Sequence, residues 1–329
     1  MQIPPSYTIT EEMLHIISQI DALRLFIMAQ EITPAVKDKV QRTSILKSSL
    51  FSARIEGNTL DMEDMIRTEE KEKKLEVFNI LKGTQFVEKS VQPKKKVTRE
   101  LVKNLHKLVL KDLSGDAGNL RTESSAIFNQ AGVAVYVPPP PKVALELLNN
   151  LLTYVNTSKE KFPLITAFIT HLIFEKIHPF IDGNGRVGRL LIVAVLKKTE
   201  YDFGFFVPFE EYLDNHKEDY YYYLDNGMQD TNSYLLFMLQ AFLAQCEEVQ
   251  RTIQLELKNK DQLGLPPRQE EIFNIIREHQ MVSLDFIRRR FLKVPERTIR
   301  YDLKKLQDGQ FITKIGKTRG SFYRVKMVK

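Results

Sequence analysis

The sequence is poor in cysteine and contains no tryptophan. Its single cysteine, Cys246, cannot form an internal disulfide, which excludes a disulfide-stabilised scaffold and predicts a reducing, cytoplasmic location. Because Cys246 falls in an apolar helical stretch, we expect a buried, unreactive thiol. The longest purely apolar run, Leu190–Leu196, is far too short to cross a bilayer. The amino terminus has no basic segment followed by an apolar one, so the sequence predicts neither a secretion signal nor a membrane partner.

The composition is that of an ordinary globular protein, with 43% hydrophobic and 27% charged residues in a chain of 329. This length favours about two or three domains. The formal net charge of +6 is unevenly distributed. Residues 266–329 contain sixteen Lys or Arg residues against seven Asp or Glu residues, a local net charge of +9, and the rest of the chain is slightly acidic. A small basic module of this kind favours a polyanionic partner.

Apolar residues recur at helical spacing through most of the chain, which predicts a mainly α-helical fold. Alternating apolar residues around 130–132 predict one short β-hairpin within it. We expect four regions: a helical amino-terminal region over 1–95, a helical core with the hairpin over 96–250, a helix end and linker over 251–265, and a winged helix-turn-helix over 266–329.

A glycine-rich loop follows a helix that is predicted to end near Ile177. Residues 178–189 read His-Pro-Phe-Ile-Asp-Gly-Asn-Gly-Arg-Val-Gly-Arg. Because the residue before a proline avoids the helical conformation, His178 begins the loop. The glycines let successive amides point at one spot, where the next helix begins, and such a spot binds anions. The expected phosphate-binding residues are Gly183, Asn184, Gly185, Arg186 and Arg189.

Two further side chains of this loop predict chemistry. The ordinary pKa of histidine lies near neutral pH, so His178 can act as a general base that takes a proton from an attacking hydroxyl. Asp182 supplies a single carboxylate, which is what Mg²⁺ usually takes from a protein when nucleotide phosphates provide other ligands. The loop therefore predicts a site for a nucleotide and Mg²⁺.

Residues 178–189 resemble the signature of the Fic family, His-Pro-Phe-x-(Asp/Glu)-Gly-Asn-Gly-Arg-x-x-Arg, and match it at every defined position. The resemblance extends over about residues 98–250. It implies transfer of AMP from ATP, with Mg²⁺, to a Ser, Thr or Tyr hydroxyl of a target protein, which can be the protein itself. By this similarity His178 is the base and Asp182 the metal ligand. Family members that transfer phosphate carry lysine where Gly185 stands here, which disfavours kinase chemistry.

The resemblance also implies roles for two neighbouring elements. The hairpin is similar to the family's flap, which would bind a target segment by strand addition. Tyrosines 220–223 are similar to Tyr-rich helices that contact adenine in this family, although tyrosines at such spacing also pack in cores. The expected flap residues are Ile127, Val135 and Tyr136, and the expected nucleotide contacts are Tyr221 and Asn226.

A second motif lies upstream of the loop. Ser52-Ala-Arg-Ile-Glu-Gly resembles the family's inhibitory sequence, (Ser/Thr)-x-x-x-Glu-(Gly/Asn). Gly57 is a natural helix stop, so Glu56 would lie at a helix end. The resemblance implies that Glu56 pairs with Arg189 and occupies the fork that the γ-phosphate of ATP needs. The alternative is an ordinary helix-terminal glutamate. Enzymes with this motif can also remove AMP from modified targets.

The basic module resembles the winged helices of bacterial repressors. Its third predicted helix, residues 298–306, would be the recognition helix, and two short strands around 317–321 would form the wing. Many winged helices instead bind proteins or mediate dimerisation, and the sequence is compatible with a homodimer. The alternative function is a DNA-binding transcriptional regulator whose Fic core only senses nucleotide. The expected DNA contacts are Arg297, Arg300, Lys304, Lys317 and Arg319.

Overall fold

The computed structural model describes residues 1–67, 69–128, 134–263, 265–292, 294–316 and 321–326. The chain divides into two compact units, Met1–Gln254 and Leu255–Lys329. The predicted mainly α-helical class is confirmed. None of the helices in the described part of the chain combines the length and the apolar character that a membrane crossing requires.

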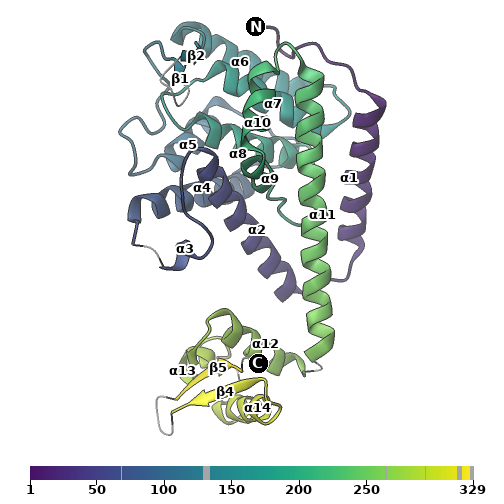
Figure 1. The fold of residues 1–329 in the computed structure, drawn as a ribbon, viewed down its shortest axis with the longest axis vertical. Coiled ribbons are helices and arrows are strands. Elements are labelled where there is room, and N and C mark those ends of the chain that lie inside the picture. The colour runs from purple at the N-terminus through teal and green to yellow at the C-terminus, as the bar shows by residue number, and fades with distance from the viewer. Residues whose placement is uncertain (68, 129–133, 264, 293, 317–320, 327–329) are drawn as a thin grey trace. The chain divides into compact units, whose positions relative to one another are not determined.

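The first unit is built from helices, with one short hairpin at its edge (Figure 1). The hairpin, which we call the flap, pairs β1 (Ile127–Phe128) antiparallel to β2 (Ala134–Tyr136) and was predicted from the alternating sequence. The helices are α1 (Glu11–Ala29), α2 (Pro34–Ile55), α3 (Asp64–Arg67), α4 (Lys71–Ser90), α5 (Arg99–Val109), α6 (Pro141–Thr157), α7 (Pro163–Ile177), α8 (Asn184–Lys198), α9 (Glu210–Asn215), α10 (Lys217–Asn226) and α11 (Thr231–Leu263), which runs on past the division at Gln254.

The centre of the first unit is the packed pair α7 and α8. Helix α7 is apolar on nearly every face, as expected of a helix that lies inside a core, and Phe168 and Phe174 on it are fully buried. Helices α2, α4 and α5 pack against α8. Residues 1–95 and 96–250, which the sequence treats as separate regions, share this one core. Cys246 is part of it and is a buried free thiol, as predicted.

The ends of α2 and α7 lie where the sequence places them. Helix α2 ends at Ile55 with Glu56 as its carboxyl cap, and Gly57 takes a φ of 107°, a conformation that favours glycine. Helix α7 ends at Ile177, and His178 caps it. These two helix ends carry the residues with the strongest functional predictions.

Beyond the end of α11, the described residues of the second unit form short helices and a small sheet. These helices are α12 (Pro267–Glu278), α13 (Leu284–Arg288) and α14 (Glu296–Asp308). Strands β3 (Val282–Ser283), β4 (Ile312–Ile315) and β5 (Phe322–Val325) form an antiparallel sheet in the order β3-β5-β4. Strand β3 was not expected, because two residues are too few for an alternating pattern to show. Ile276, Ile299 and Tyr323 belong to its separate hydrophobic core.

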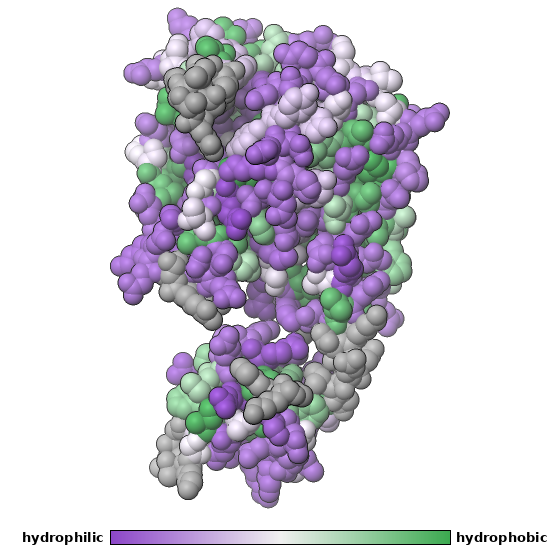
Figure 2. Space-filling model, viewed as in Figure 1, coloured by the Kyte–Doolittle hydropathy of each residue, from purple (hydrophilic) through white to green (hydrophobic). Residues whose placement is uncertain are grey.

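Polar and charged residues cover most of the molecular face in Figure 2, where hydrophobic residues form separate patches. Scattered apolar residues of this kind are normal on protein surfaces. The hydropathy of this face therefore does not locate a functional site.

Candidate functional site

Residues 178–189 form the connection from α7 to α8 and the first turns of α8. His178 has φ 48° and ψ 62°, the left-handed conformation that is uncommon for a residue with a side chain. Gly183 also has a positive φ, 77°, and caps the amino end of α8. Asn184 closes the loop, since its Oδ1 accepts from the backbone nitrogen of Phe180 at 3.0 Å and its Nδ2 donates to the carbonyl oxygen of Phe180 at 2.9 Å.

The loop rests on a histidine of α5 that the sequence did not single out. Nδ1 of His106 accepts from the backbone nitrogen of Gly118 at 2.8 Å, so the proton of the neutral ring lies on Nε2, which donates to the carbonyl oxygen of Asp182 at 2.9 Å. Burial lowers the pKa of His106, which keeps the ring neutral. The ring also stacks on Phe180 with 3.7 Å between centroids. His106 therefore stabilises the loop through its hydrogen bond to Asp182 and its stacking on Phe180.

His178 has the properties of a base. Burial lowers the pKa of His178, a hydrogen bond at the backbone of Glu175 partly offsets this, and the nearby positive charge of Arg121 lowers the pKa further. The ring is therefore neutral at physiological pH and able to accept a proton.

Arg189 is buried and held by the end of α2. Its Nη2 donates to Oε1 of Glu56 at 2.9 Å, so the structure brings together the pair that the sequence predicts. Ser52 accepts two more hydrogen bonds, at its Oγ from Nε and at its carbonyl oxygen from Nη2, each at 2.9 Å. A Cβ at Gly185 would collide with Oε1 of Glu56. The Glu56 carboxylate thus lies over the glycine-rich turn, where an anion would bind.

Two other carboxyl groups near Arg189 are shielded from solvent, with the Glu175 side chain 10% exposed and Glu210 2% exposed. Burial and the charge of Glu56 raise the pKa of Glu175 to about 8, so this group is neutral at pH 7. Burial raises the pKa of Glu210 to about 7. His171 is buried too, and burial and Arg189 lower its pKa to about 3. Glu56 is therefore the carboxylate that balances the charge of Arg189.

Arg186 is held by two carboxylates instead of one. Its Nη2 lies 2.8 Å from both carboxylate oxygens of Asp182, the predicted metal ligand. Its Nη1 donates to Oε1 of Glu76 on α4 at 2.6 Å, a contact that the sequence did not indicate. Oε2 of Glu76 accepts from Nδ2 of Asn58 at 2.8 Å. The segment of residues 56–58 therefore contacts Arg189 directly and Arg186 through Glu76.

A cavity of about 690 Å³ borders this group of charges. Glu56, Glu76, Asp182 and Arg186 line it together with residues of α4 and the end of α5. Asp182 is a single carboxylate with 61% of its side chain exposed, which fits an ion such as Mg²⁺ that takes its other ligands from phosphates and water. Among the residues that the structure describes, no group of three or more His, Cys, Asp or Glu side chains could hold a metal.

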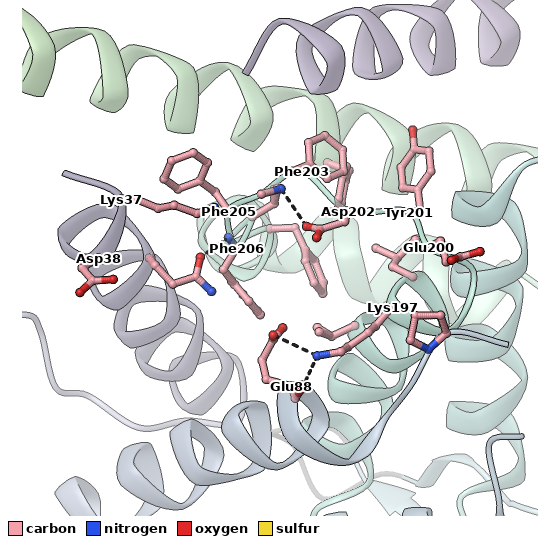
Figure 3. Close-up of a pocket in the computed structure, with 18 residues that line it drawn as sticks. Lys37, Asp38, Glu88, Lys197, Glu200, Tyr201, Asp202, Phe203, Phe205 and Phe206 are labelled. Atoms are coloured by element: carbon pink, nitrogen blue, oxygen red, sulfur yellow. Dashed lines mark hydrogen bonds and ion pairs between the residues drawn. The ribbon is translucent and has the colours of Figure 1, made fainter. Parts of the chain in front are cut away.

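A different cavity, of about 610 Å³, is shown in Figure 3. Its lining is rich in aromatic side chains, including Phe203, Phe205 and Phe206, with Lys37 of α2 at its side. Lys197 of α8 donates to Oε2 of Glu88 at 3.1 Å within it. None of residues 178–189 lines this cavity, so it is separate from the candidate site.

The remaining predicted contacts of the first unit lie in several places. Oη of Tyr221 donates to the carbonyl oxygen of Ile55 at 3.1 Å, beside the Glu56 helix end. Asn226 is exposed, and its Nδ2 donates to Tyr222 of its own helix at 2.8 Å. Tyr136 reaches the end of α7, whereas the side chains of Ile127 and Val135 lie outside the described part of the structure.

The predicted DNA contacts of the second unit include exposed residues of α14. Arg297 and Lys304 are exposed, and Arg300 pairs with Glu296 through Nε at 2.8 Å. Lys317 and Arg319 lie outside the described residues. Helix α14 thus presents basic side chains on the surface of its own unit.

The sequence missed three residues that shape the loop: His106, Glu76 and Arg121. Arg121 is 5% exposed and donates to the carbonyl oxygen of His178 from Nε at 2.7 Å. Each of the three reaches the loop from at least 50 residues away in the sequence. The sequence contained no local pattern for them beyond the burial of a polar side chain, which only the fold reveals.

Comparison with known proteins places this geometry in a family context. Residues 96–196 match the model of the Fic/DOC family. The protein adenylyltransferase Fic of Aedes aegypti is 33% identical over 141 residues, which cover 42% of this chain and 26% of that protein. The protein adenylyltransferase Fic of Drosophila willistoni is 26% identical over 197 residues, covering 56% of this chain and 38% of that protein. The chain therefore spans well under half the length of these relatives.

A solved structure resembles nearly the whole chain. The crystal structure of a Fic family protein from Desulfovibrio desulfuricans superposes with a TM-score of 0.68 and covers 98% of both chains at 22% identity. At this identity the comparison shows a similar fold and nothing further. The residues over which the family model matches include the loop and most of α8.

Proposed function

Residues 96–196 of this chain form a Fic/DOC family domain, and from that premise we propose that the protein transfers AMP from ATP to a hydroxyl group of a target protein. The observation that carries the proposal is one loop in which a neutral histidine lies beside a glycine turn and two arginines. Base and anion site are the two parts that such a transfer needs. The named relatives support the reaction class.

The reaction follows from the placement of these groups. The acceptor hydroxyl gives its proton to His178 while its oxygen forms a bond to the α-phosphorus of ATP. The bond from that phosphorus to the bridging oxygen breaks, and its electron pair leaves on pyrophosphate. The Gly185 amide at the start of α8, with Arg186 and Arg189, would hold the phosphates in line, whereas the Gly183 amide donates to Oδ1 of Asp182 at 2.6 Å. Mg²⁺ at Asp182 would neutralise phosphate charge when bound.

We propose that the chain as found here is autoinhibited. The Glu56 carboxylate occupies the Arg189 fork and lies over Gly185, so an incoming triphosphate meets both a competitor and a repelling charge. Ser52, the other fixed position of the inhibitory motif, holds the same arginine. This position over Gly185 and against Arg189 supports an inhibitory role for Glu56 over that of an ordinary helix-terminal glutamate.

Labelled ATP tests the reaction. The full chain with Glu56→Gly is incubated with Mg²⁺ and ATP labelled at either the α- or the γ-phosphate, and protein-bound label is followed. We expect α-label on the protein, and none when His178→Ala is added to the same variant. Label from the γ-position would mean phosphate transfer, and no label from either position in a folded variant that binds ATP would favour a nucleotide sensor.

For the second unit we propose a winged helix that binds DNA through α14. The supporting observation is the exposure of Arg297 and Lys304 on that helix, within a region of net charge +9. Binding should weaken steeply with salt, because cations that contact phosphates release counterions. Double substitution of Arg297 and Lys304 by alanine should reduce both the affinity and the salt dependence, measured on mixed-sequence duplex DNA. Equal binding by wild type and variant would remove this proposal.

A further inference from the structure

The carboxyl end of α7 is held by side chains from the flap region. The last carbonyl groups of a helix have no partner within it and need other donors. Oη of Tyr136 in β2 donates to the carbonyl oxygen of Lys176 at 2.7 Å. Arg121 donates from Nε to the carbonyl oxygen of His178 at 2.7 Å and from its backbone nitrogen to that of Pro179 at 3.0 Å. The backbone on both sides of the base is thus fixed from outside.

Arg121 also holds both ends of the flap. Its Nη1 donates to the carbonyl oxygen of Glu123, which precedes β1, at 3.1 Å. Its Nη2 donates to the carbonyl oxygen of Pro139, which follows β2. A guanidinium spreads its donors over three nitrogens in a rigid fork and can serve these separate carbonyls together, whereas the donors of a lysine all lie on one nitrogen. One buried side chain therefore links the flap to His178.

Lys176 fixes the orientation of Tyr136. Its Nζ lies 4.7 Å from the centroid of the Tyr136 ring, close enough for a cation–π attraction. The same Nζ donates to the carbonyl oxygen of Asp225 at 3.1 Å, and Lys176 is buried. The Tyr136 hydroxyl and ring are thus both engaged at the last turn of α7.

We propose that Arg121 and Tyr136 are positioning residues that join the flap and His178 into one element, so that a target strand on β2 presents its hydroxyl at a set distance from the base. The proposal rests on the AMP transfer proposed above. His178 keeps a left-handed backbone, which a residue with a Cβ adopts when its surroundings enforce it. Transfer requires reacting atoms about 3 to 3.5 Å apart, and an error of about 1 Å costs on the order of a hundredfold in rate.

Hydrogen exchange tests the connection without any activity. In the full chain, Tyr136→Phe should accelerate exchange of the amides of residues 134–136, and Arg121→Lys should accelerate it more. Tyr234→Phe is the matched control, because Oη of Tyr234 also donates to a carbonyl oxygen of α7, that of Phe168 at 3.1 Å, away from the flap. Unchanged exchange at 134–136 in Tyr136→Phe would overturn the proposal even if Arg121→Lys failed to fold.

Kinetics then test the consequence for transfer, with self-labelling from α-labelled ATP in the Glu56→Gly parent. Tyr136→Phe should lower kcat about threefold to tenfold, the effect of one lost hydrogen bond, and Arg121→Lys about tenfold to a hundredfold. The Kd of ATP should stay within about twofold, since neither side chain contacts the phosphate-binding residues. An unlabelled parent would count against the proposed AMP transfer, and the exchange result would still decide the connection between the flap and His178. A labelled parent with unchanged kcat in both variants would refute the positioning role.

Discussion

Arg186 and Arg189 lie one helical turn apart on α8, yet their surroundings differ. Arg189 is 1% exposed, and the carboxylate it contacts is Glu56, at the end of α2. Arg186 is 6% exposed and contacts two carboxylates, Asp182 of its own loop and Glu76 of α4. Glu175 and Glu210, whose charges would act on Arg189, are shielded from solvent and have raised pKa values, whereas Asp182 is largely exposed.

Substitution of a single glutamate therefore breaks the ion pair of Arg189 with Glu56, whereas Arg186 keeps a second ion pair. Removal of Glu56 leaves Arg189 with its hydrogen bonds to Ser52 and a vacant direction toward the glycine turn. Removal of Glu76 still leaves Arg186 in a bidentate contact with Asp182. We therefore expect Arg189 to act as the main switch and Arg186 to have a smaller, graded influence.

The largest expected effect is that of Glu56→Gly. A hydrogen bond between charged groups contributes about 1.5–3 kcal/mol. Without the Glu56 carboxylate, ATP no longer has to displace this bond from Arg189, so the rate of AMP transfer should rise about tenfold to a hundredfold. Initial rates with α-labelled ATP measure this. Glu56→Gln is the matched control, because it removes the charge but keeps the bulk over Gly185. Its rate should lie between the rates of the wild type and of Glu56→Gly. A folded Glu56→Gly variant with the wild-type rate would contradict the expectation that the Glu56 contact with Arg189 limits transfer.

A smaller effect is expected at the other arginine. Glu76→Gln neutralises one of the two carboxylates that hold Arg186, and because both contacts to Asp182 remain we expect a net change of about 0.5–1 kcal/mol, so ATP should bind about twofold to fivefold more tightly. Calorimetry in a His178→Ala background, where no turnover occurs, gives the Kd. Glu72→Gln is the control, since Glu72 lies on the same helix and lines the same cavity. Weaker ATP binding in Glu76→Gln would show that Glu76 orients Arg186 and does not compete for it.

A third prediction concerns the pH dependence of stability near Arg189 and not nucleotide binding. The pKa of Glu175 is about 8 in the folded protein, well above the ordinary value of about 4.3. Between these values the folded chain keeps a proton that the unfolded chain has released, so the free energy of unfolding falls as pH rises from about 4.5 to 8. Glu175→Gln should flatten this slope, and Glu210 should sustain a remainder. Urea unfolding at pH 5 to 8 measures both, and parallel slopes for wild type and variant would contradict the expectation.

The sequence predicted the parts of the site that are local in the chain. Residues 178–189 form a loop and a helix start because proline and glycine constrain the backbone at those positions, and Glu56 lies at a helix end because Gly57 follows it. Glu76 and Arg121 were missed because their contacts join segments more than 50 residues apart. Strand β3 was missed because its pairing with β5 depends on the whole second unit.

The absence of a side chain at Gly185 matters for the contact between Glu56 and Arg189. The atom position where any side chain would begin at residue 185 is already taken by the Glu56 carboxylate. A side chain at residue 185 would therefore have to displace this carboxylate from the glycine turn, and the ion pair with Arg189 would move with it. The identity of residue 185 and the strength of the Glu56–Arg189 contact are thus coupled through one small volume.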